Sequence, residues 1–331
     1  MNSGLKFYSI VIPTLKYTNH NLTGVIEVSN LKKSYGNIVA LDGISFEVKK
    51  GEAFAFLGPN GAGKTTTIKI LMGFLYPDSG EVKIFGKDVN RYEKEIRKRI
   101  GFLPEEVGFY ENLTVYDNMD FYARLFGISK LERNKIIKET LERVGLLDRK
   151  DSKVKELSHG MKQRLGIAQS LINHPELLIY DEPTSGLDPR SSYEVRKLIK
   201  DLLREGVTLF LSSHLLYEVQ QICDTVAIID KGKLVKKDRI ENLIREIRGQ
   251  TIRVRITCLN LNEDILKIAR EVRGVTRIKT SDKAIIADVK DEDTIANLNS
   301  AITKAGGRIT KIEHLTPDLE QIFLKLTGEN K

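Results

Sequence analysis

Residues 58–65, GPNGAGKT, match the pattern G-x-x-x-x-G-K-[ST] at every fixed position and follow the apolar run AFAFL. Glycines in such a turn let successive backbone N–H groups point toward one centre, and the N-terminus of the following helix adds positive potential there. The pattern therefore predicts a phosphate-binding loop. Lys64 is expected to reach the β- and γ-phosphates, and the Thr65 hydroxyl to bind the Mg²⁺ that bridges them. The residues expected to contact the nucleotide are Gly58, Pro59, Asn60, Gly61, Ala62, Gly63, Lys64, Thr65 and Thr66.

Two adjacent acids, Asp181 and Glu182, end the apolar segment LLIYDEP. Carboxylates placed together at the end of a strand can divide two tasks. Asp181 would hold Mg²⁺ directly or through water, and Glu182 would polarise an attacking water as a general base. The alternatives are a helix cap for the acids and a glycine-rich turn with an incidental lysine for the loop. The presence of both motifs in one chain favours a nucleotide hydrolase.

The composition is that of an ordinary globular protein of about two domains, with 331 residues, 41% of them hydrophobic and 30% charged. No apolar segment approaches the roughly 20 residues that cross a bilayer, and the N-terminus lacks signal-peptide features, so a cytosolic location is expected.

The net charge is +8, but basic and acidic residues are mixed along the helical patterns, so nucleic-acid binding is not expected. Cys223 and Cys258 have no partners at ligand spacing and are expected to be core residues.

The periodicity of apolar residues divides the chain into three parts. Residues 1–24 show no clear period and are expected to form an N-terminal extension. Residues 25–245 combine short strands, helical stripes over about 115–150, and a strand-helix alternation that predicts a parallel sheet covered on both faces. Ligands of such sheets bind at the carboxyl ends of the strands. Residues 251–331 follow the order β-α-β-β-α-β, which predicts a small ferredoxin-like α+β accessory domain, with a final helix that docks.

Four further segments occur in a fixed order around these motifs: Tyr35, LSHGM at 157–161, SGLDP at 185–189, and His214. With them, the chain resembles the ATP-binding-cassette (ABC) transporter ATPases over nearly all of residues 25–245. The ordered set is far more specific than any single motif. The resemblance implies a P-loop cassette with a parallel sheet core, an antiparallel β subdomain and a helical subdomain. It also implies ATP and Mg²⁺ as cofactors.

The resemblance implies a role for each of these segments. LSHGM is similar to the family's signature motif LSGGQ, so Ser158 and Gly160 would donate to the γ-phosphate of an ATP held by a second subunit. SGLDP is similar to the D-loop, which makes Asp188 a candidate nucleotide-binding residue. His214 corresponds to the switch histidine at the γ-phosphate, and Tyr35 to the aromatic residue that stacks on adenine. Two chains would then pair head to tail around two ATP molecules.

Two positions depart from the family pattern. Glu105 stands where the family usually has glutamine; a carboxylate can bind Mg²⁺ or accept from water, but it cannot donate a hydrogen bond. His159 replaces the first glycine of the signature, and its side chain is expected to crowd the approach of the partner's phosphate.

The function predicted from these motifs is that of the ATPase subunit of an exporter, acting on a separate integral membrane permease at the cytoplasmic face of the membrane. The variant LPEE and the segment DLEQIFLKLTG resemble the export branch of the family.

A soluble ABC ATPase that acts on nucleic acid or ribosomes is the alternative, although the interval between Lys64 and Ser158 contains no sustained heptads. A third interpretation is a nucleotide switch that does not hydrolyse ATP. Co-purification with a membrane protein distinguishes the three. The sequence does not indicate the cargo.

Overall fold

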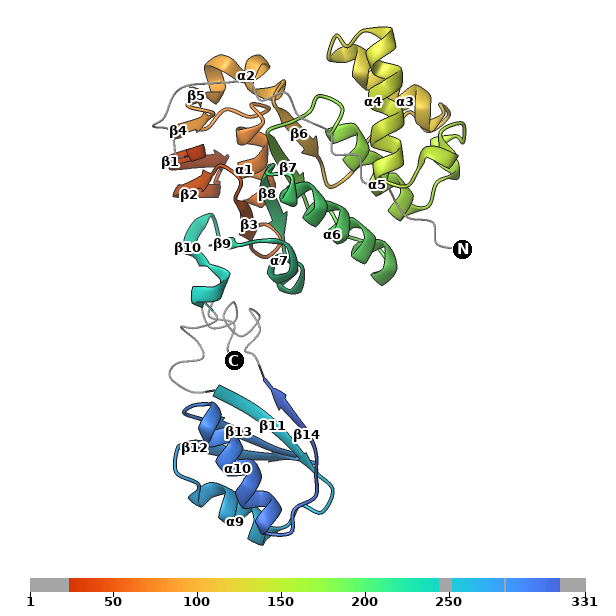
Figure 1. Cartoon of the computed structure of the whole chain (residues 1–331). Helices are drawn as coiled ribbons and strands as arrows, with labels where there is room; N and C mark the ends of the chain where they lie inside the picture. The colour runs from red at the N-terminus through yellow and green to blue at the C-terminus, as the bar shows by residue number, and fades with distance from the viewer. Residues whose placement is uncertain (1–23, 244–251, 283, 316–331) are drawn as a thin grey trace.

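The computed structural model describes residues 24–243, 252–282 and 284–315 (Figure 1). Its largest sheet has six strands in the order β10-β9-β3-β8-β7-β6, all parallel except β10, which pairs antiparallel with β9. The strands are β3 (Ala53–Leu57), β6 (Ile100–Leu103), β7 (Leu177–Asp181), β8 (Thr208–Ser213), β9 (Thr225–Asp230) and β10 (Lys233–Arg239). Every residue of β3 and β7 is buried, as expected for strands covered on both faces. The predicted parallel sheet is confirmed.

A second, antiparallel sheet has the order β2-β1-β4-β5 and forms the predicted antiparallel subdomain. Its strands are β1 (Gly24–Tyr35), β2 (Ile38–Lys49), β4 (Ser79–Ile84) and β5 (Lys87–Asp88). One hydrophobic core joins it to the large sheet. In that core the ring centroid of Phe46 on β2 lies 5.6 Å from that of Phe54 on β3 and 6.0 Å from that of Phe210 on β8. This packing fixes β3, the strand from which the phosphate loop emerges.

Helices lie on both sides of the large sheet, and α3, α4 and α5 pack together at one side of it (Figure 1). The helical elements are α1 (Lys64–Leu71), α2 (Val89–Arg97), α3 (Val115–Leu125), α4 (Lys130–Arg143), the 3-10 turns η1 (Leu147–Arg149) and η2 (Val154–Glu156), α5 (His159–Ser170), α6 (Pro189–Arg204) and α7 (Leu216–Ile222). Side-chain oxygens of Thr114, Ser129 and Ser158 accept from backbone N–H groups and start α3, α4 and α5. The helical segment expected over about 115–150 is confirmed.

Asp120 on α3 binds two arginines in the group of helices formed by α3, α4 and α5. Arg124 lies on the same helix, and Arg133 joins α3 to α4. The Asp120 carboxylate accepts hydrogen bonds from Nε of Arg124 at 2.6 Å and from Nε of Arg133, on α4, at 2.7 Å. Burial alone would raise the pKa of Asp120, but the hydrogen bonds from Arg133 and Arg124 outweigh it and hold the pKa below its ordinary value. The ionised pair therefore stabilises the fold above the unfolded-state pKa of about 4, and this stabilisation is lost as the pH falls through the folded-state value.

We expect Asp120→Asn to lower the free energy of unfolding by about 1–3 kcal/mol at pH 7, since it weakens hydrogen bonds between charged groups. The difference from wild type should shrink as the pH falls from about 4 through the lowered folded-state pKa of Asp120, where the wild-type carboxylate becomes protonated as well. Urea unfolding at pH 7 and at pH 3 measures both effects. Asp151→Asn, at an exposed side chain whose cation lies 3.9 Å away, is the control and should change little. Equal stability of Asp120→Asn and wild type at pH 7 would contradict the assignment.

The C-terminal unit contains the predicted element order β-α-β-β-α-β. Its elements are β11 (Ile252–Cys258), α9 (Glu263–Glu271), β12 (Val275–Ser281), β13 (Ala284–Val289), α10 (Glu292–Lys304) and β14 (Ile309–His314). The strands form one antiparallel sheet in the order β12-β13-β11-β14. The unit has its own hydrophobic core, which includes Cys258; Cys223 is buried in the α/β unit, and both are free thiols in the core, as the sequence predicts.

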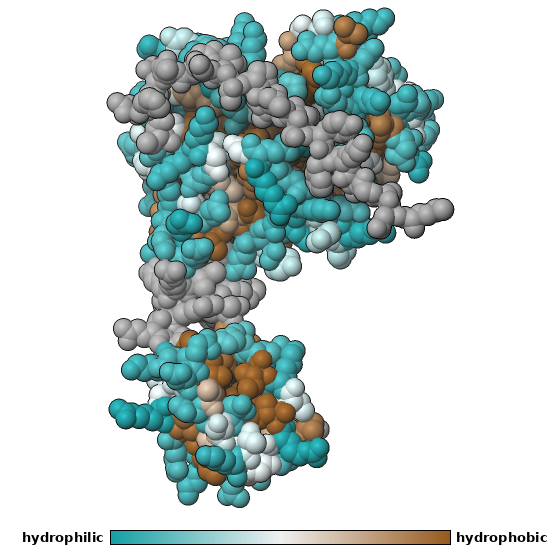
Figure 2. All heavy atoms as spheres, viewed as in Figure 1, coloured by the Kyte–Doolittle hydropathy of each residue, from teal (hydrophilic) through white to brown (hydrophobic). Residues whose placement is uncertain are grey.

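Hydrophobic side chains gather on the face of the C-terminal unit that Figure 2 shows. Among the described residues of this unit, the large apolar side chains that remain exposed are those of Leu259, Ile268 and Ile312. The expected N-terminal extension, residues 1–24, lies outside the described residues except for Gly24, and so does the final helix expected after Thr316.

Candidate nucleotide-binding site

The carboxyl ends of three neighbouring strands bring the phosphate loop and the two acids together. β8 lies between β3 and β7 in the sheet, and the loop follows β3 while Asp181 and Glu182 end β7. A cavity of about 380 Å³ opens at this edge. It is lined by Ala40, Asn60, Gly61, Gly63, Lys64, Thr65, Thr66, Glu105 and Glu182. Residues from four separate segments of the chain therefore face one space.

Three glycines give the phosphate loop its shape for two different reasons. Gly61 and Gly63 have φ angles of 80° and 110°, in the left-handed region that side chains disfavour. At Gly58 the constraint is space, because a Cβ would lie 2.3 Å from the carbonyl oxygen of Ile229 on β9. The Gly58 N–H donates to the carbonyl oxygen of Ser213 at 3.2 Å, which anchors the loop to the end of β8.

Lys64 is folded back on the loop that it starts from. Its side chain is only 6% exposed, and Nζ donates to the carbonyl oxygens of Gly58 at 2.8 Å and Pro59 at 3.2 Å. The same nitrogen lies 3.2 Å from Oε1 of Glu182. The only buried cation among the described residues therefore lies between the loop and the candidate general base, where a phosphate could replace the carbonyl contacts.

Asp181 is buried and accepts hydrogen bonds from two hydroxyl groups. Thr65 Oγ1 donates to Oδ2 at 3.2 Å, and Ser212 Oγ donates to Oδ1. Burial raises the pKa of Asp181 above its ordinary value, the neighbouring Glu182 carboxylate adds to the rise, and the hydrogen bonds from Ser212 and Thr65 oppose it. A carboxylate whose charged form is disfavoured by burial gains more than an exposed one from a cation placed beside it.

Glu182 has a strained backbone that the end of β8 holds in place. Its φ is 48°, and its N–H donates to the hydroxyl oxygen of Ser212 at 3.1 Å. Oε2 of the buried carboxylate lies 2.9 Å from Nδ1 of His214. Oε1 accepts no hydrogen bond from the described residues, although Lys64 Nζ is near. Glu182 thus has one oxygen oriented by the histidine and one, paired with the Lys64 cation, that becomes available to a ligand when Lys64 moves to the phosphates.

The oxygen atoms near Thr65 fit a magnesium ion better than a transition metal. Thr65 and Asp181 supply a hydroxyl and a carboxylate, and Glu105 adds an exposed carboxylate on the rim of the cavity. No group of three or more His, Cys, Asp or Glu side chains suited to a metal occurs in residues 24–243, 252–282 and 284–315. Mg²⁺ commonly takes one or two protein oxygens and completes its shell with phosphates and water.

The signature and D-loop residues do not line this cavity. Ser158 Oγ accepts from the N–H of Met161 at 3.3 Å as the cap of α5. Asp188 caps α6: it accepts from Ser191 Oγ at 2.6 Å and from the Ser191 N–H at 3.0 Å, and these bonds lower its pKa. Gly160 is buried, and a Cβ there would lie 2.4 Å from Ser191 Oγ. Within one chain, Asp188 therefore caps α6, and the absence of a side chain at Gly160 allows α5 to pack closely against α6.

His159 occupies the first turn of α5 without a backbone that requires glycine. It is exposed, it is absent from the described residues with positive φ, and its Nε2 lies 3.4 Å from the carbonyl oxygen of Ser185. Tyr35, at the end of β1, leaves 47% of its surface exposed and does not line the cavity. The other expected residues do not line the cavity, but each is next in sequence to a lining residue or bonds one: they are Gly58, Pro59, Ala62, Asp181 and His214.

Sequence reasoning did not identify several side chains that orient this site. Ser212 bonds both Asp181 and Glu182, yet a serine within an apolar strand has no distinctive pattern. Gln163 and Glu218 contact the segment after Glu182 from α5 and α7, and their spacing in sequence gives no sign of it. The only signal available was their polarity at buried positions on apolar faces.

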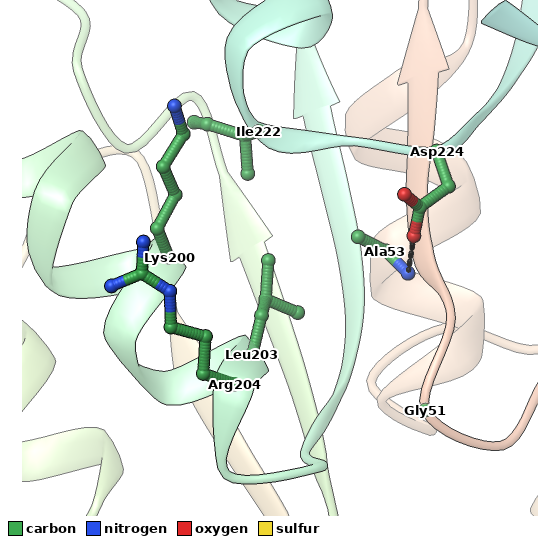
Figure 3. Close-up of a pocket in the computed structure, with 7 residues that line it drawn as sticks. All are labelled: Gly51, Ala53, Lys200, Leu203, Arg204, Ile222 and Asp224. Carbon is green, nitrogen blue, oxygen red and sulfur yellow. Dashed lines mark hydrogen bonds between the residues drawn. The ribbon is translucent and has the colours of Figure 1, made fainter.

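A second cavity, of about 290 Å³, lies at the opposite end of the strands (Figure 3). Lys200, Leu203 and Arg204 reach it from α6, and Asp224 accepts from the N–H of Ala53, the first residue of β3, at 3.4 Å. Because the phosphate loop follows the last residue of β3, this cavity is separate from the candidate nucleotide site.

Comparison with known proteins places the chain in a family. Residues 41–185 match the family model described as "ABC transporter", and residues 239–327 match "ATP-binding protein DrrA1-3-like, C-terminal domain". The linearmycin resistance ATP-binding protein LnrL of Bacillus subtilis (strain 168) is 34% identical over 307 residues, which cover 92% of this chain and 98% of that protein. The chain belongs to the ATP-binding subunits of ABC transporters. The resemblance to ABC ATPases is thereby confirmed.

A second ABC relative agrees over nearly the whole length, and solved ABC cassettes agree over about two thirds of it. The bacitracin transport ATP-binding protein BcrA of Bacillus licheniformis is 38% identical over 308 residues, 93% of this chain and 98% of that protein. Among solved structures, cbiO1 from Clostridium perfringens, part of the ABC transporter complex cbiONQ, has a TM-score of 0.62 and 30% identity, and covers 69% of this chain and 95% of that one. The dimeric cassette MJ0796 has a TM-score of 0.60 and 28% identity, and covers 65% and 98%. As an ABC ATPase subunit, the chain binds and hydrolyses ATP.

Proposed function

We propose that this ABC subunit binds MgATP in the cavity at the end of β3, and that its hydrolysis drives an exporter whose membrane-spanning part is a separate permease. The observation that carries the proposal is the convergence of Lys64, Asp181, Glu182 and His214 at the carboxyl ends of β3, β7 and β8. Transfer of a γ-phosphate to water requires a cation at the phosphates, a carboxylate for Mg²⁺ and a residue that orients the attacking water. His214 orients the last of these, Glu182.

In the proposed mechanism, each of these side chains has one task. Lys64 leaves the carbonyl oxygens of the loop and contacts the β- and γ-phosphates, while the loop N–H groups bind the remaining phosphate oxygens. Thr65 and Asp181 would hold Mg²⁺, which supplies charge neutralisation at the phosphates. Once Lys64 has moved to the phosphates, Glu182 accepts a proton from the attacking water through Oε1, and His214 holds the other carboxylate oxygen.

The γ-phosphate also needs donors that this cavity does not contain, and we propose that a second copy of the chain supplies them. Ser158 and Gly160 start α5, and neither lines the cavity of its own chain. A helix N-terminus is a suitable anion site, so the α5 N-terminus of one chain would complete the site of the other. The dimeric structure of the related cassette MJ0796 supports this arrangement, in which Asp188 would lie at the interface and Tyr35 would stack on adenine.

An exporter, rather than an importer, is favoured by the names of the relatives. They include a linearmycin resistance protein, a bacitracin transport protein and a Nod factor export protein of Ralstonia nicotianae (strain ATCC BAA-1114 / GMI1000), which is 33% identical over 308 residues. Among the described residues, no helix has both the length and the hydrophobicity to cross a bilayer. We therefore propose that the subunit lies at the cytoplasmic face of the membrane, bound to its permease.

The helical lobe offers the permease an exposed apolar surface. Leu125 on α3 is 68% exposed, and Tyr110, before α3, is 51% exposed beside the ring of Phe121, with centroids 5.0 Å apart. A membrane partner that binds here would sit next to the segment bearing Glu105, on the rim of the cavity. Contact at this surface could thus be transmitted to the nucleotide.

We propose domain boundaries at 25–245 for the nucleotide-binding domain and 251–331 for an accessory domain, preceded by the extension 1–24. The order β12-β13-β11-β14, with α9 and α10 as crossovers between strands that are not neighbours, supports a ferredoxin-like fold for the accessory domain. Every proposed nucleotide contact lies between Tyr35 and His214, so the accessory domain would regulate the enzyme or support its dimerisation.

The proposed partnership is tested by affinity purification of the chain co-expressed with a candidate permease, with ATP hydrolysis measured in parallel. Leu125→Glu should abolish recovery of the permease while hydrolysis by the isolated chain stays within about twofold, because α3 lies outside the cavity. Tyr92→Glu, at an exposed apolar side chain of α2, is the control and should retain the permease. Recovery of ribosomes or nucleic acid in place of a permease would contradict the exporter assignment.

A further inference from the structure

The segment between Glu182 and α6 is bound from α7 by one buried carboxylate. Glu218 is only 7% exposed, and its Oε2 accepts a hydrogen bond from the hydroxyl of Thr184, a residue 4% exposed and two positions after Glu182. A buried carboxylate is unfavourable unless its lone pairs are satisfied, so this contact strongly restrains both side chains.

The second oxygen of Glu218 binds the other end of the same segment. Oε1 accepts from Nη1 of Arg196, on α6, at 3.2 Å, and the Arg196 guanidinium lies 5.7 Å from the ring centroid of Tyr217. Since Thr184 precedes residues 185–188 and α6 follows them, one carboxylate joins the two sides of this loop.

The position of Glu218 also relates the loop to the candidate switch histidine. His214 lies two positions before α7, and Glu218 is in the first turn of that helix, four positions further along the chain. The two side chains contact Glu182 and Thr184, which are two positions apart. From the opposite side, Gln163 Nε2 on α5 donates to the carbonyl oxygen of Pro183 at 2.7 Å. The short segment from His214 into α7 therefore contacts both Glu182 and, through Glu218, the loop that follows it.

We infer that Glu218 is a positioning residue for ATP hydrolysis: through Thr184 and Arg196 it makes residues 182–188 follow the histidine at the γ-phosphate. This inference rests on the proposed ATPase site. Glu218 touches no reacting atom in this role. Its loss should therefore lower the hydrolysis rate, which depends on the placement of Glu182, much more than the affinity for MgATP, which depends on the phosphate loop.

The test compares full-length variants with similar side-chain shapes. Thr184→Val removes the hydroxyl at nearly constant volume, whereas Thr184→Ser keeps it. We expect Thr184→Val to lower kcat about tenfold while KM for MgATP stays within about twofold of wild type. Thr184→Ser should keep most of the wild-type rate. The double variant Thr184→Val with Glu218→Gln should be no slower than the slower of the two single variants. Asp201→Asn, which removes the partner of Arg204 on the exposed face of α6, is the charge control and should match wild type.

Two results would overturn the inference. One is equal kcat for Thr184→Val and wild type; the other is additive effects of Thr184→Val and Glu218→Gln. NMR of the His214 imidazole provides a readout that does not need turnover, because Thr184→Val should shift the His214 resonances, and Asp201→Asn should not. Failure of the wild-type chain to hydrolyse ATP would contradict the proposed function alone. Unshifted His214 resonances would contradict the inference even then.

Discussion

Glu182→Gln should bind MgATP but hydrolyse it about 10² to 10⁴ times more slowly than wild type, because the amide keeps the size of the side chain and loses the charge that polarises water. The Gln oxygen can still contact His214 as Oε2 does now, at 2.9 Å, so the orientation of the side chain should persist. Uncleaved ATP would then remain between the loop of one chain and the α5 N-terminus of the other. Size-exclusion chromatography should show a dimer with MgATP and a monomer with ADP.

The control for this experiment is His159→Gly in the same background. His159 is exposed at the start of α5 and contacts the segment around Ser185, so its side chain could weaken pairing without affecting hydrolysis. If the double variant forms a dimer and Glu182→Gln does not, the His159 side chain weakens the pairing of the two chains. If the double variant binds MgATP and remains a monomer, the isolated chain does not form the ATP sandwich. A rate equal to wild type for Glu182→Gln would exclude Glu182 as the base.

Lys64→Ala should reduce MgATP affinity by about 100-fold or more, since it removes a charged donor shared by two phosphates, with each such bond worth about 1.5–3 kcal/mol. Isothermal titration measures it. Lys69→Ala is the matched control, because Lys69 is an exposed cation on the same helix and does not line the cavity. Lys64→Ala also leaves the buried Glu182 without its cation, so a thermal melt must show a folded variant. Unchanged affinity in a folded variant would mean that Lys64 does not face the phosphates.

The sequence predicted the arrangement of the site where local pattern and sheet topology determine it. A glycine-rich loop after one apolar strand and two acids after another must lie at the same sheet edge when both strands run parallel in one sheet. Side-chain contacts between distant segments could not be predicted in this way. Ser212 orients both acids only because β8 lies between β3 and β7. No single segment of the sequence determines that strand order.

His159 and Gly160, in the signature motif, also show that a sequence pattern does not predict contacts between distant segments. From the motif alone, His159 and Gly160 occupy equivalent glycine positions and invite the same explanation, close approach of a phosphate. In the fold they differ: position 159 has space and an ordinary helical backbone, while position 160 faces Ser191 so closely that any side chain would collide. The glycine requirement at 160 therefore includes internal packing against α6, which depends on tertiary structure.

The direction of the hydrogen bond between Thr65 and Asp181 has a consequence for how a metal ion would enter. Because the Thr65 hydroxyl gives its only hydrogen to Asp181, its lone pairs are directed elsewhere. A cation arriving beside Thr65 would meet an oxygen already in its ligating orientation, with no hydroxyl rotation and no displaced proton. The geometry of metal binding would then be set during folding, and the association step would mainly involve the exchange of water from the ion's own shell.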